Sequence, residues 1–209
     1  ATLLTWYRNN VLHLFMHLGL VAFAFRNNAA FSLDDLDALL TPAWPLLAQE
    51  LYFAPPDDPR QRLADTLAVL TEEGLLQATD NGWRRQPGHL ESSEHLRLLG
   101  QPVQPTLERA YLLLASLLRY SSGELTREVL EEHSRQLAER LTLLAGLNAP
   151  EFFDKRLFSG LLDTLEQQGW LRVENEHLFY EESLARLQRR SRALFDPELR
   201  HRLVRLTRQ

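Results

Sequence analysis

One pattern occurs twice in this chain of 209 residues and constrains its fold more than any other feature. The segment LAVLTEEGLLQATDNGW, residues 67–83, aligns without gaps with LDTLEQQGWLRVENEHL, residues 162–178. In both copies, leucines at helical spacing end at a glycine, Gly74 or Gly169, and two short extended runs follow. The first pair of runs flanks an Asn-Gly dipeptide, which is a strong hairpin signal. The repeat predicts two units in which a helix leads into a two-stranded wing.

Helix-capping signals fill most of the remaining chain. Ser32 with Asp35 predicts a helix to Leu40, and prolines then separate it from a helix over residues 46–53. Further helices are expected over residues 60–73, 93–99, 106–120, 125–145 and 182–194, with a last one after Asp196-Pro197. The fold class is therefore mainly α, a helical domain with two short β-hairpin wings, for which a tandem winged-helix-like arrangement is one interpretation. We expect one unit over residues 1–100 and a second over residues 101–209 that ends in Arg-rich helices.

The charge distribution argues against nucleic acid as a partner. The net charge is -5, although the last 25 residues hold eight arginines and two carboxylates, so the rest of the chain carries about -11. A winged helix that binds DNA needs basic side chains on the helix that enters the groove. The corresponding helices here carry Asp65, Glu72 and Asp163 among others, and only Arg84 and Arg85 in the first wing favour phosphate. The absence of cysteine suits a reducing cytoplasm.

The apolar opening segment, TWYRNNVLHLFMHLGLVAFAF, resembles the start of a membrane span but is too short for one. Its apolar run of fifteen residues, 11–25, lies between Arg8 and Arg26 and contains two histidines, whereas a bilayer span needs roughly 20 apolar residues. Asn10, His13 and His17 form a narrow polar stripe on a helix. We expect a core or interface helix, with a membrane-surface helix as the alternative. No initiating Met is present, which indicates a piece of a longer protein.

Motifs for catalysis or for a metal are not found in the sequence. His13 and His17 have the spacing of a helical metal pair, but no third ligand or catalytic Glu accompanies them, so a buried or interface pair is the better interpretation. Phosphate-binding loops, dinucleotide fingerprints and nucleophile elbows do not occur. We expect no catalytic residue, no metal and no cofactor in this chain.

Two longer stretches resemble a known family. TWYRNNVLHLF, residues 5–15, and GLNAPEFFDKRLFSGLLDTLEQQGWL, residues 146–171, look like the C-terminal region of the bacterial membrane-associated glycerol-3-phosphate 1-O-acyltransferase. The resemblance extends from about residue 4 to residue 171 and leaves the Arg-rich end unmatched. It implies an enzyme that transfers an acyl group from acyl-CoA or acyl-acyl-carrier-protein to glycerol 3-phosphate, the first step of phospholipid synthesis, at the cytoplasmic face of the bacterial inner membrane.

The family's catalytic motif, His-x4-Asp, is missing from this sequence. None of the seven histidines is followed by Asp at the fifth position; His89 with Glu94 and His177 with Glu182 come nearest. The resemblance therefore implies that the catalytic domain lies upstream of Ala1, and that this chain is a C-terminal domain, inactive alone, that supports it.

Two surfaces are predicted to carry contacts. The polar residues of the opening helix are expected to meet the catalytic domain: Tyr7, Arg8, Asn9, Asn10 and His13. Trp6, Phe15 and Leu18 on the same helix are expected to pack internally. As an alternative function, the chain is a peripheral membrane-binding or protein-interaction adaptor, in which arginines attract anionic lipid. The candidates for that membrane surface are Arg186, Arg190, Arg202 and Arg205; a solvated basic face is the simpler interpretation.

Overall fold

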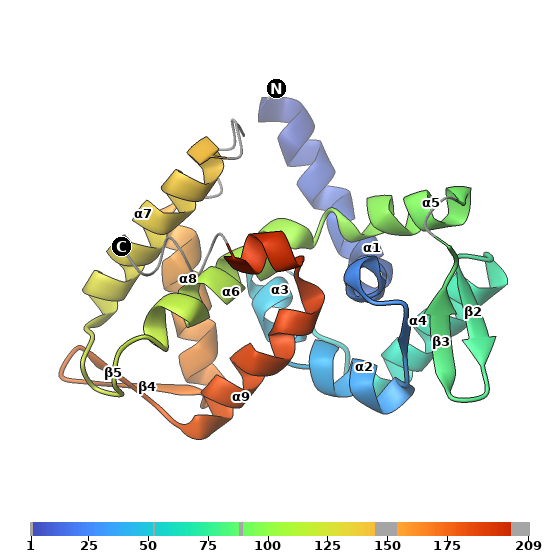
Figure 1. The fold of residues 1–209 in the computed structure, drawn as a ribbon. Helices are drawn as coiled ribbons and strands as arrows, with labels where there is room; N and C mark the ends of the chain where they lie inside the picture. Colours follow the sequence, from blue (N-terminus) through green and yellow to red (C-terminus); the bar gives the residue numbers. More distant parts are fainter. Residues whose placement is uncertain (1, 52, 88–89, 145–153, 202–209) are drawn as a thin grey trace. The chain divides into compact units, whose positions relative to one another are not determined.

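The structure is a computed structural model, and it describes residues 2–51, 53–87, 90–144 and 154–201, with the side chains of residues 2–14 and 143–144 outside the description. The chain divides into two compact units, Ala1–Gln104 and Pro105–Gln209. Helices dominate both units in the described part of the chain, and each unit contains one small antiparallel sheet (Figure 1). The predicted fold class, mainly α with two hairpins, is confirmed.

Unit 1 is built around the second half of one long helix. Its elements in chain order are α1 (Thr2–Asn27), β1 (Ala30–Phe31), α2 (Leu33–Leu40), α3 (Ala43–Leu51), α4 (Pro59–Glu72), β2 (Leu76–Thr79), β3 (Gly82–Arg85) and α5 (Glu91–Gly100). Met16 and every residue from Leu20 to Phe25 are at most 2% exposed. Helix α5 crosses α1 so closely that a Cβ on Gly19 would lie 2.9 Å from the Leu99 carbonyl oxygen. The apolar run of the opening segment is therefore the centre of a protein core.

Predicted helix starts in unit 1 follow the capping chemistry, with one error. The Ser32 hydroxyl accepts the Asp35 N–H at 3.1 Å, and the Asp58 carboxylate accepts the Gln61 N–H at 2.9 Å. Helix α3 was expected to begin after Pro45, but it begins at Ala43. Pro45 fits there because the N–H groups of a first helical turn have no intrahelical acceptor, so a residue without an N–H costs nothing.

Unit 2 repeats much of this order. Its elements are α6 (Gln104–Leu117), α7 (Arg127–Leu144), α8 (Lys155–Gln167), β4 (Leu171–Glu174), β5 (His177–Tyr180), α9 (Glu182–Ser191) and the 3₁₀ turn η2 (Arg192–Leu194); a further helix starts at Pro197. Its core includes Leu112, Phe158, Leu161 and Leu178, each at most 1% exposed. Arg127 joins α7 to α8, because its guanidinium donates to Asp163 at 2.6 Å, to Ser159 and to Glu131.

The repeated helix–glycine–hairpin pattern is present in both units. Gly74 and Gly169 share a φ of +69°, and each follows its helix as the left-handed residue of a Schellman cap. The N–H of the next residue bonds back to the helix, from Leu75 to Leu70 and from Trp170 to Leu165. Thr79 pairs with Gly82 in the first hairpin, and Glu174 pairs with His177 in the second.

A third extended segment joins each hairpin, which the sequence pattern did not predict. In unit 1, β1 pairs with β3 through Phe31 and Trp83, giving the sheet order β1-β3-β2. In unit 2, the corresponding contact is a single antiparallel bridge between Thr126 and His177, supported by the Leu178 N–H bond to the Leu125 carbonyl. β1 lies just before α2 and Thr126 lies just before α7, so each hairpin is bonded to the residues that precede one of these helices.

Candidate functional site

The predicted contact residues of the opening helix lie on the first half of α1. Tyr7, Arg8, Asn9, Asn10 and His13 belong to the helical backbone, but their side chains lie outside the described residues. Their role in contacting another domain therefore stays a prediction. Phe15 was expected to pack internally, and this is wrong: its side chain is 47% exposed, although the neighbouring Met16 is fully buried. Consecutive helical residues point about 100° apart, so Met16 faces the core while Phe15 lies on an uncovered side of α1.

His17, on α1, packs against aromatic side chains of unit 1. Its ring lies 4.7 Å from the Trp44 ring, and Phe53 completes an aromatic group with centroid distances of 6.4 Å to both. The imidazole Nδ1 is buried and has no hydrogen-bond partner among the described residues. Burial lowers the pKa of His17, and the positive charge of Arg62 lowers it further. His17 is thus a neutral aromatic packing residue near pH 7.

The histidine that comes closest to the His-x4-Asp spacing is used structurally. His177 Nδ1 lies 2.9 Å from the Gly123 carbonyl oxygen, which holds the ring against the segment before α7. Glu182, five residues later, binds Arg189 instead of the imidazole. His89, which has the other approximate spacing, lies outside the described residues. Within the described ranges, no three His, Cys, Asp or Glu side chains are grouped so that they could hold a metal ion.

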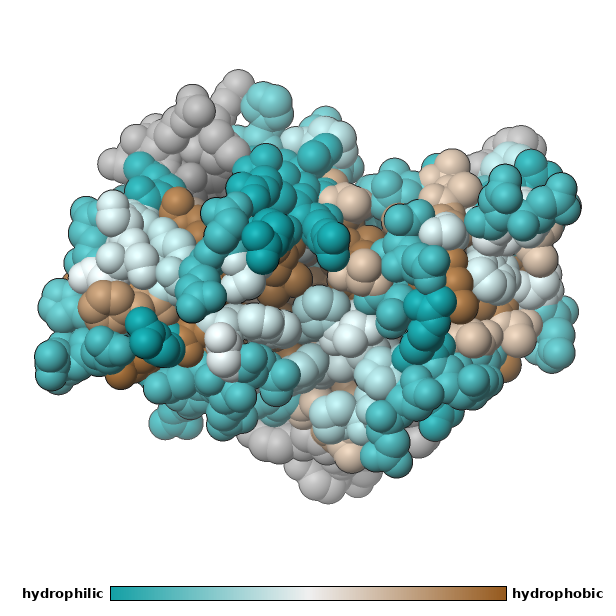
Figure 2. Space-filling view, turned by 90° about the horizontal axis from the view of Figure 1, so that it is seen from below, coloured by the Kyte–Doolittle hydropathy of each residue, from teal (hydrophilic) through white to brown (hydrophobic). Residues whose placement is uncertain are grey.

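Only two of the four predicted membrane-surface arginines are among the residues that the structure describes. Arg186 and Arg190 are exposed, one turn apart on α9, and the opposite side of α9 buries Leu184 and Gln188. Arg202 and Arg205 lie outside the described residues. The apolar side of α9 is therefore already used by the core of unit 2, and the exposed side carries the arginines together with Glu182, which pairs with Arg189. Figure 2 shows one face of the molecule, on which hydrophilic residues cover most of the described surface.

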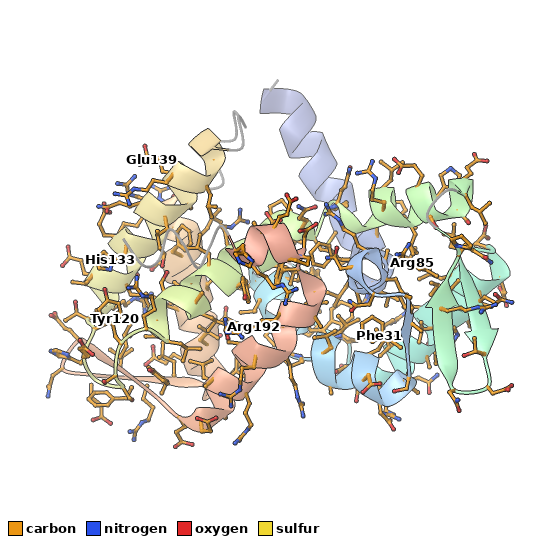
Figure 3. The ribbon with its side chains drawn as sticks, viewed as in Figure 1. Phe31, Arg85, Tyr120, His133, Glu139 and Arg192 are labelled. Atoms are coloured by element: carbon orange, nitrogen blue, oxygen red, sulfur yellow. The ribbon has the colours of Figure 1, made fainter. Side chains whose placement is uncertain are left out.

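A buried tyrosine in unit 2 lies within the electrostatic influence of two arginines near the end of the chain. Tyr111 on α6 is 4% exposed, and its ring packs on Phe195 with the centroids 4.6 Å apart. Burial raises the pKa of Tyr111, while the positive charges of Arg192 and Arg200 act in the opposite direction. The Arg192 side chain itself is exposed. Arg192 is labelled in Figure 3, directly after α9. The sequence pattern missed this group because about 80 residues separate the tyrosine from the arginines.

None of the described helices is long and apolar enough to cross a membrane.

Comparison with known proteins gives one consistent result. Residues 1–174 match the family described as the glycerol-3-phosphate acyltransferase C-terminal region. The chain is 37% identical over 189 residues to a glycerol-3-phosphate acyltransferase of Pseudomonas putida, covering 90% of this chain and 23% of that protein. Matches of 38% over 172 residues in Aeromonas hydrophila and 35% over 216 residues in Xanthomonas axonopodis cover 82% and 99% of this chain, and 21% and 24% of those proteins. The chain thus spans about a quarter of the length of these relatives. The matched residues include the whole first hairpin and, in the second hairpin, the strand β4. Because the match covers most of the chain, the chain belongs to the glycerol-3-phosphate acyltransferase C-terminal region family.

Proposed function

We propose that this chain is the non-catalytic C-terminal domain of a glycerol-3-phosphate 1-O-acyltransferase and that it supports an upstream catalytic domain. The observation that carries the proposal is the family match over residues 1–174 together with relatives about four times as long. The lack of any His-x4-Asp motif in the sequence agrees with it, since the Asp-oriented histidine is the group expected to deprotonate the substrate hydroxyl. Acyl transfer from acyl-CoA or acyl-acyl-carrier-protein then belongs to the whole enzyme.

The first half of α1 is the proposed contact with the catalytic domain. The helical backbone of α1 extends from His17 back to Thr2, and the side chain of Phe15 is 47% exposed. An exposed aromatic side chain such as Phe15 is suited to a protein interface, where aromatic residues are enriched. Tyr7, Arg8, Asn9, Asn10 and His13 would supply the polar contacts.

The test compares the chain with the whole enzyme. We expect the isolated 209-residue chain to show no acyl transfer to glycerol 3-phosphate, and a rate near that of the whole enzyme would refute the proposal. In the whole enzyme, Arg8→Glu combined with His13→Glu should lower activity or yield, because a buried like or unpaired charge weakens an interface by several kcal/mol. Arg156→Glu, on the exposed start of α8, is the matched control and should leave activity near that of the parent.

The proposed location is the cytoplasmic face of the bacterial inner membrane, with anionic lipid as a further partner of this domain. Arg186 and Arg190 on the exposed side of α9 favour this second role, since each basic group near an anionic surface contributes about 1 kcal/mol. The simpler adaptor function, binding a membrane or protein without any catalytic domain, rests on the same arginines. Vesicle co-sedimentation at low salt should fall after charge reversal at Arg186, Arg190, Arg202 and Arg205, and no binding at low salt would exclude lipid as a partner.

We also infer that each unit is winged-helix-like. The order helix, short extended segment, helix, glycine-capped helix and hairpin supports this in both units, as does the sheet order β1-β3-β2 in unit 1. The exposed side of α4 carries Asp65 and Glu72, and that of α8 carries Asp163 and Glu166. Because acidic helices repel phosphate, the proposed partners of these units exclude nucleic acid.

A further inference from the structure

Helix α4 packs one side on the core of unit 1 and leaves the opposite side uncovered. The core side includes leucines that are at most 3% exposed: Leu63, Leu67 and Leu70. Val69 lies on the opposite side and is 45% exposed. Asp65 lies one helical turn before Val69, and Glu72 and Glu73 lie one turn after it, all of them exposed. These four residues form what we call the acidic face of α4, in which three carboxylates surround a valine.

The carboxylates of the acidic face have no ion-pair partner within the described part of the chain. Asp65 accepts a hydrogen bond from the neutral side-chain amide of Gln61 at 2.8 Å. Glu72 and Glu73 form no ion pair among the described residues. Arg62 lies at the start of the same side of α4, so three carboxylates and one cation leave this side negatively charged.

The place of the two glutamates on α4 is unfavourable for the helix itself. Glu72 is the last residue of α4, and Glu73 is its C-cap. The unpaired carbonyl groups of a helix give its C-terminal end a partial negative charge, which repels a carboxylate there. In the second copy of the repeat, the equivalent residues at the end of α8 are the neutral Gln167 and Gln168. The two glutamates are therefore not explained by the stability of α4.

The equivalent side of α8 is covered in unit 2. Val69 corresponds in the repeat to Thr164, which is 3% exposed and donates its hydroxyl to the Gly160 carbonyl at 3.0 Å. Gly160 stands at the place of Asp65 and is buried as well. Unit 1 thus leaves open, and lines with charge, a helix side that unit 2 buries. An apolar centre with a charged rim is the composition of a protein contact surface.

We propose that the acidic face of α4 binds a positively charged segment of the upstream part of the enzyme. Charge complementarity selects this occupant, because unpaired carboxylates attract Arg and Lys side chains and repel acidic ones. This chain covers 23% of the Pseudomonas putida relative, so most of such an enzyme lies outside it. A segment of the same polypeptide meets α4 at a high effective concentration, so a small contact is sufficient. The proposal rests on the proposed function, since it requires an upstream domain.

The first experiment replaces Val69 in the whole enzyme with the photo-crosslinking residue p-benzoylphenylalanine and identifies the linked peptide by mass spectrometry. We expect a link to an Arg- or Lys-containing segment upstream of Ala1. Val129 is the matched control, because it is a helical valine with a similar exposure of 42%, on α7. The same replacement at Val129 should link to that segment with a yield at least about fivefold lower. The absence of an upstream link from position 69, or a link to α9 of a second copy instead, overturns the proposal.

The second experiment separates binding from folding. The double variant Glu72→Gln, Glu73→Gln introduces the side chains that the repeat has at the end of α8. In the 209-residue chain it should leave the urea midpoint unchanged or raise it, because it removes negative charge from a helix C-terminus. In the whole enzyme it should lower the crosslink yield from position 69 at least about threefold, and higher salt should lower the parent's yield too.

The control for charge is the double variant Glu166→Gln, Glu181→Gln, which removes two exposed carboxylates from unit 2 and should leave the crosslink yield unchanged. A yield that Glu72→Gln with Glu73→Gln does not lower overturns the proposal. Such a result differs from failure of the proposed function, which acyl transfer by the isolated chain would refute. An enzyme without the crosslink retains its separate catalytic domain and loses this contact alone.

Discussion

A methyl group added at the crossing of α1 and α5 should destabilise the chain, although the same change stabilises most helices. Gly19 lies inside α1, where glycine costs roughly 0.5–1 kcal/mol relative to alanine, so Gly19→Ala improves the helix itself. A Cβ at this position would, however, lie 2.9 Å from the Leu99 carbonyl oxygen and 3.4 Å from Val103 Cγ1. The first contact is with backbone, so α5 must move rather than a side chain rotate.

The expected magnitude follows from these opposing effects. Overpacking a well-packed core costs about 1–3 kcal/mol, which exceeds the gain in helix propensity. We therefore expect Gly19→Ala to lower the free energy of unfolding by about 1 kcal/mol, and Gly100→Ala to lower it too, because its Cβ would lie 3.0 Å from the Phe23 backbone. Urea unfolding followed by circular dichroism measures both. Ala68→Gly, on the exposed side of α4, calibrates the propensity effect. A Gly19→Ala chain more stable than its parent would show that the helices separate freely and would refute the close-crossing argument.

Three further predictions concern a turn, an ion-pair group and a histidine. Glu176→Gly should raise the free energy of unfolding by about 0.5–1 kcal/mol, because Asn175 and Glu176 both have positive φ, 51° and 68°, a type I′ geometry that suits Asn-Gly; an unchanged urea midpoint would contradict this. Arg127→Gln should lower the free energy of unfolding by about 2 kcal/mol, since it leaves the Glu131 carboxylate, 9% exposed, without its closest cation. Arg135→Gln should cost less, because the carboxylates of its partners Glu132 and Glu139 are 40% and 45% exposed; equal losses would show that burial of the carboxylate adds nothing. The pKa of His17 lies below 6.5 in the folded chain, so the unfolded chain binds more protons and stability should fall as the pH drops through 6.5. His17→Phe should reduce the difference between the unfolding free energies at pH 7 and pH 5, and an unaltered difference would assign it to other groups.

Local signals predicted most of the helices and both hairpins because the chemistry that begins and ends these elements is local. Ser32 and Asp58 cap the N–H groups of the next turn, and glycines after α4 and α8 take a backbone conformation that other residues avoid. These interactions span at most five residues, so they are legible in a single sequence. The error at Pro45 came from treating proline as a barrier where a first turn accepts it.

Contacts between distant residues were not predictable by the same means. Nothing local indicates that His17 packs on Trp44, that Phe31 pairs with Trp83, or that α1 leaves Phe15 exposed, because each depends on which elements meet in space. The packing of the Tyr111 ring on Phe195 is a further contact of this kind, because the two residues lie far apart in the sequence.

The spacing of the repeat helps to explain one difference between the two units, namely that unit 1 has two short helices where unit 2 has one long helix. Leu67 and Leu162 are 95 residues apart, and so are Phe31 and Thr126, which each take part in the third-strand contact of their units. The same spacing places Pro42 and Pro45 opposite Leu137 and Arg140. Neither proline can donate an N–H group to the preceding turn, so unit 1 breaks into α2 and α3, whereas α7 runs without interruption from Arg127 to Leu144. The difference between the two units in this stretch therefore follows from two prolines, while the glycine caps and the hairpins keep the common arrangement.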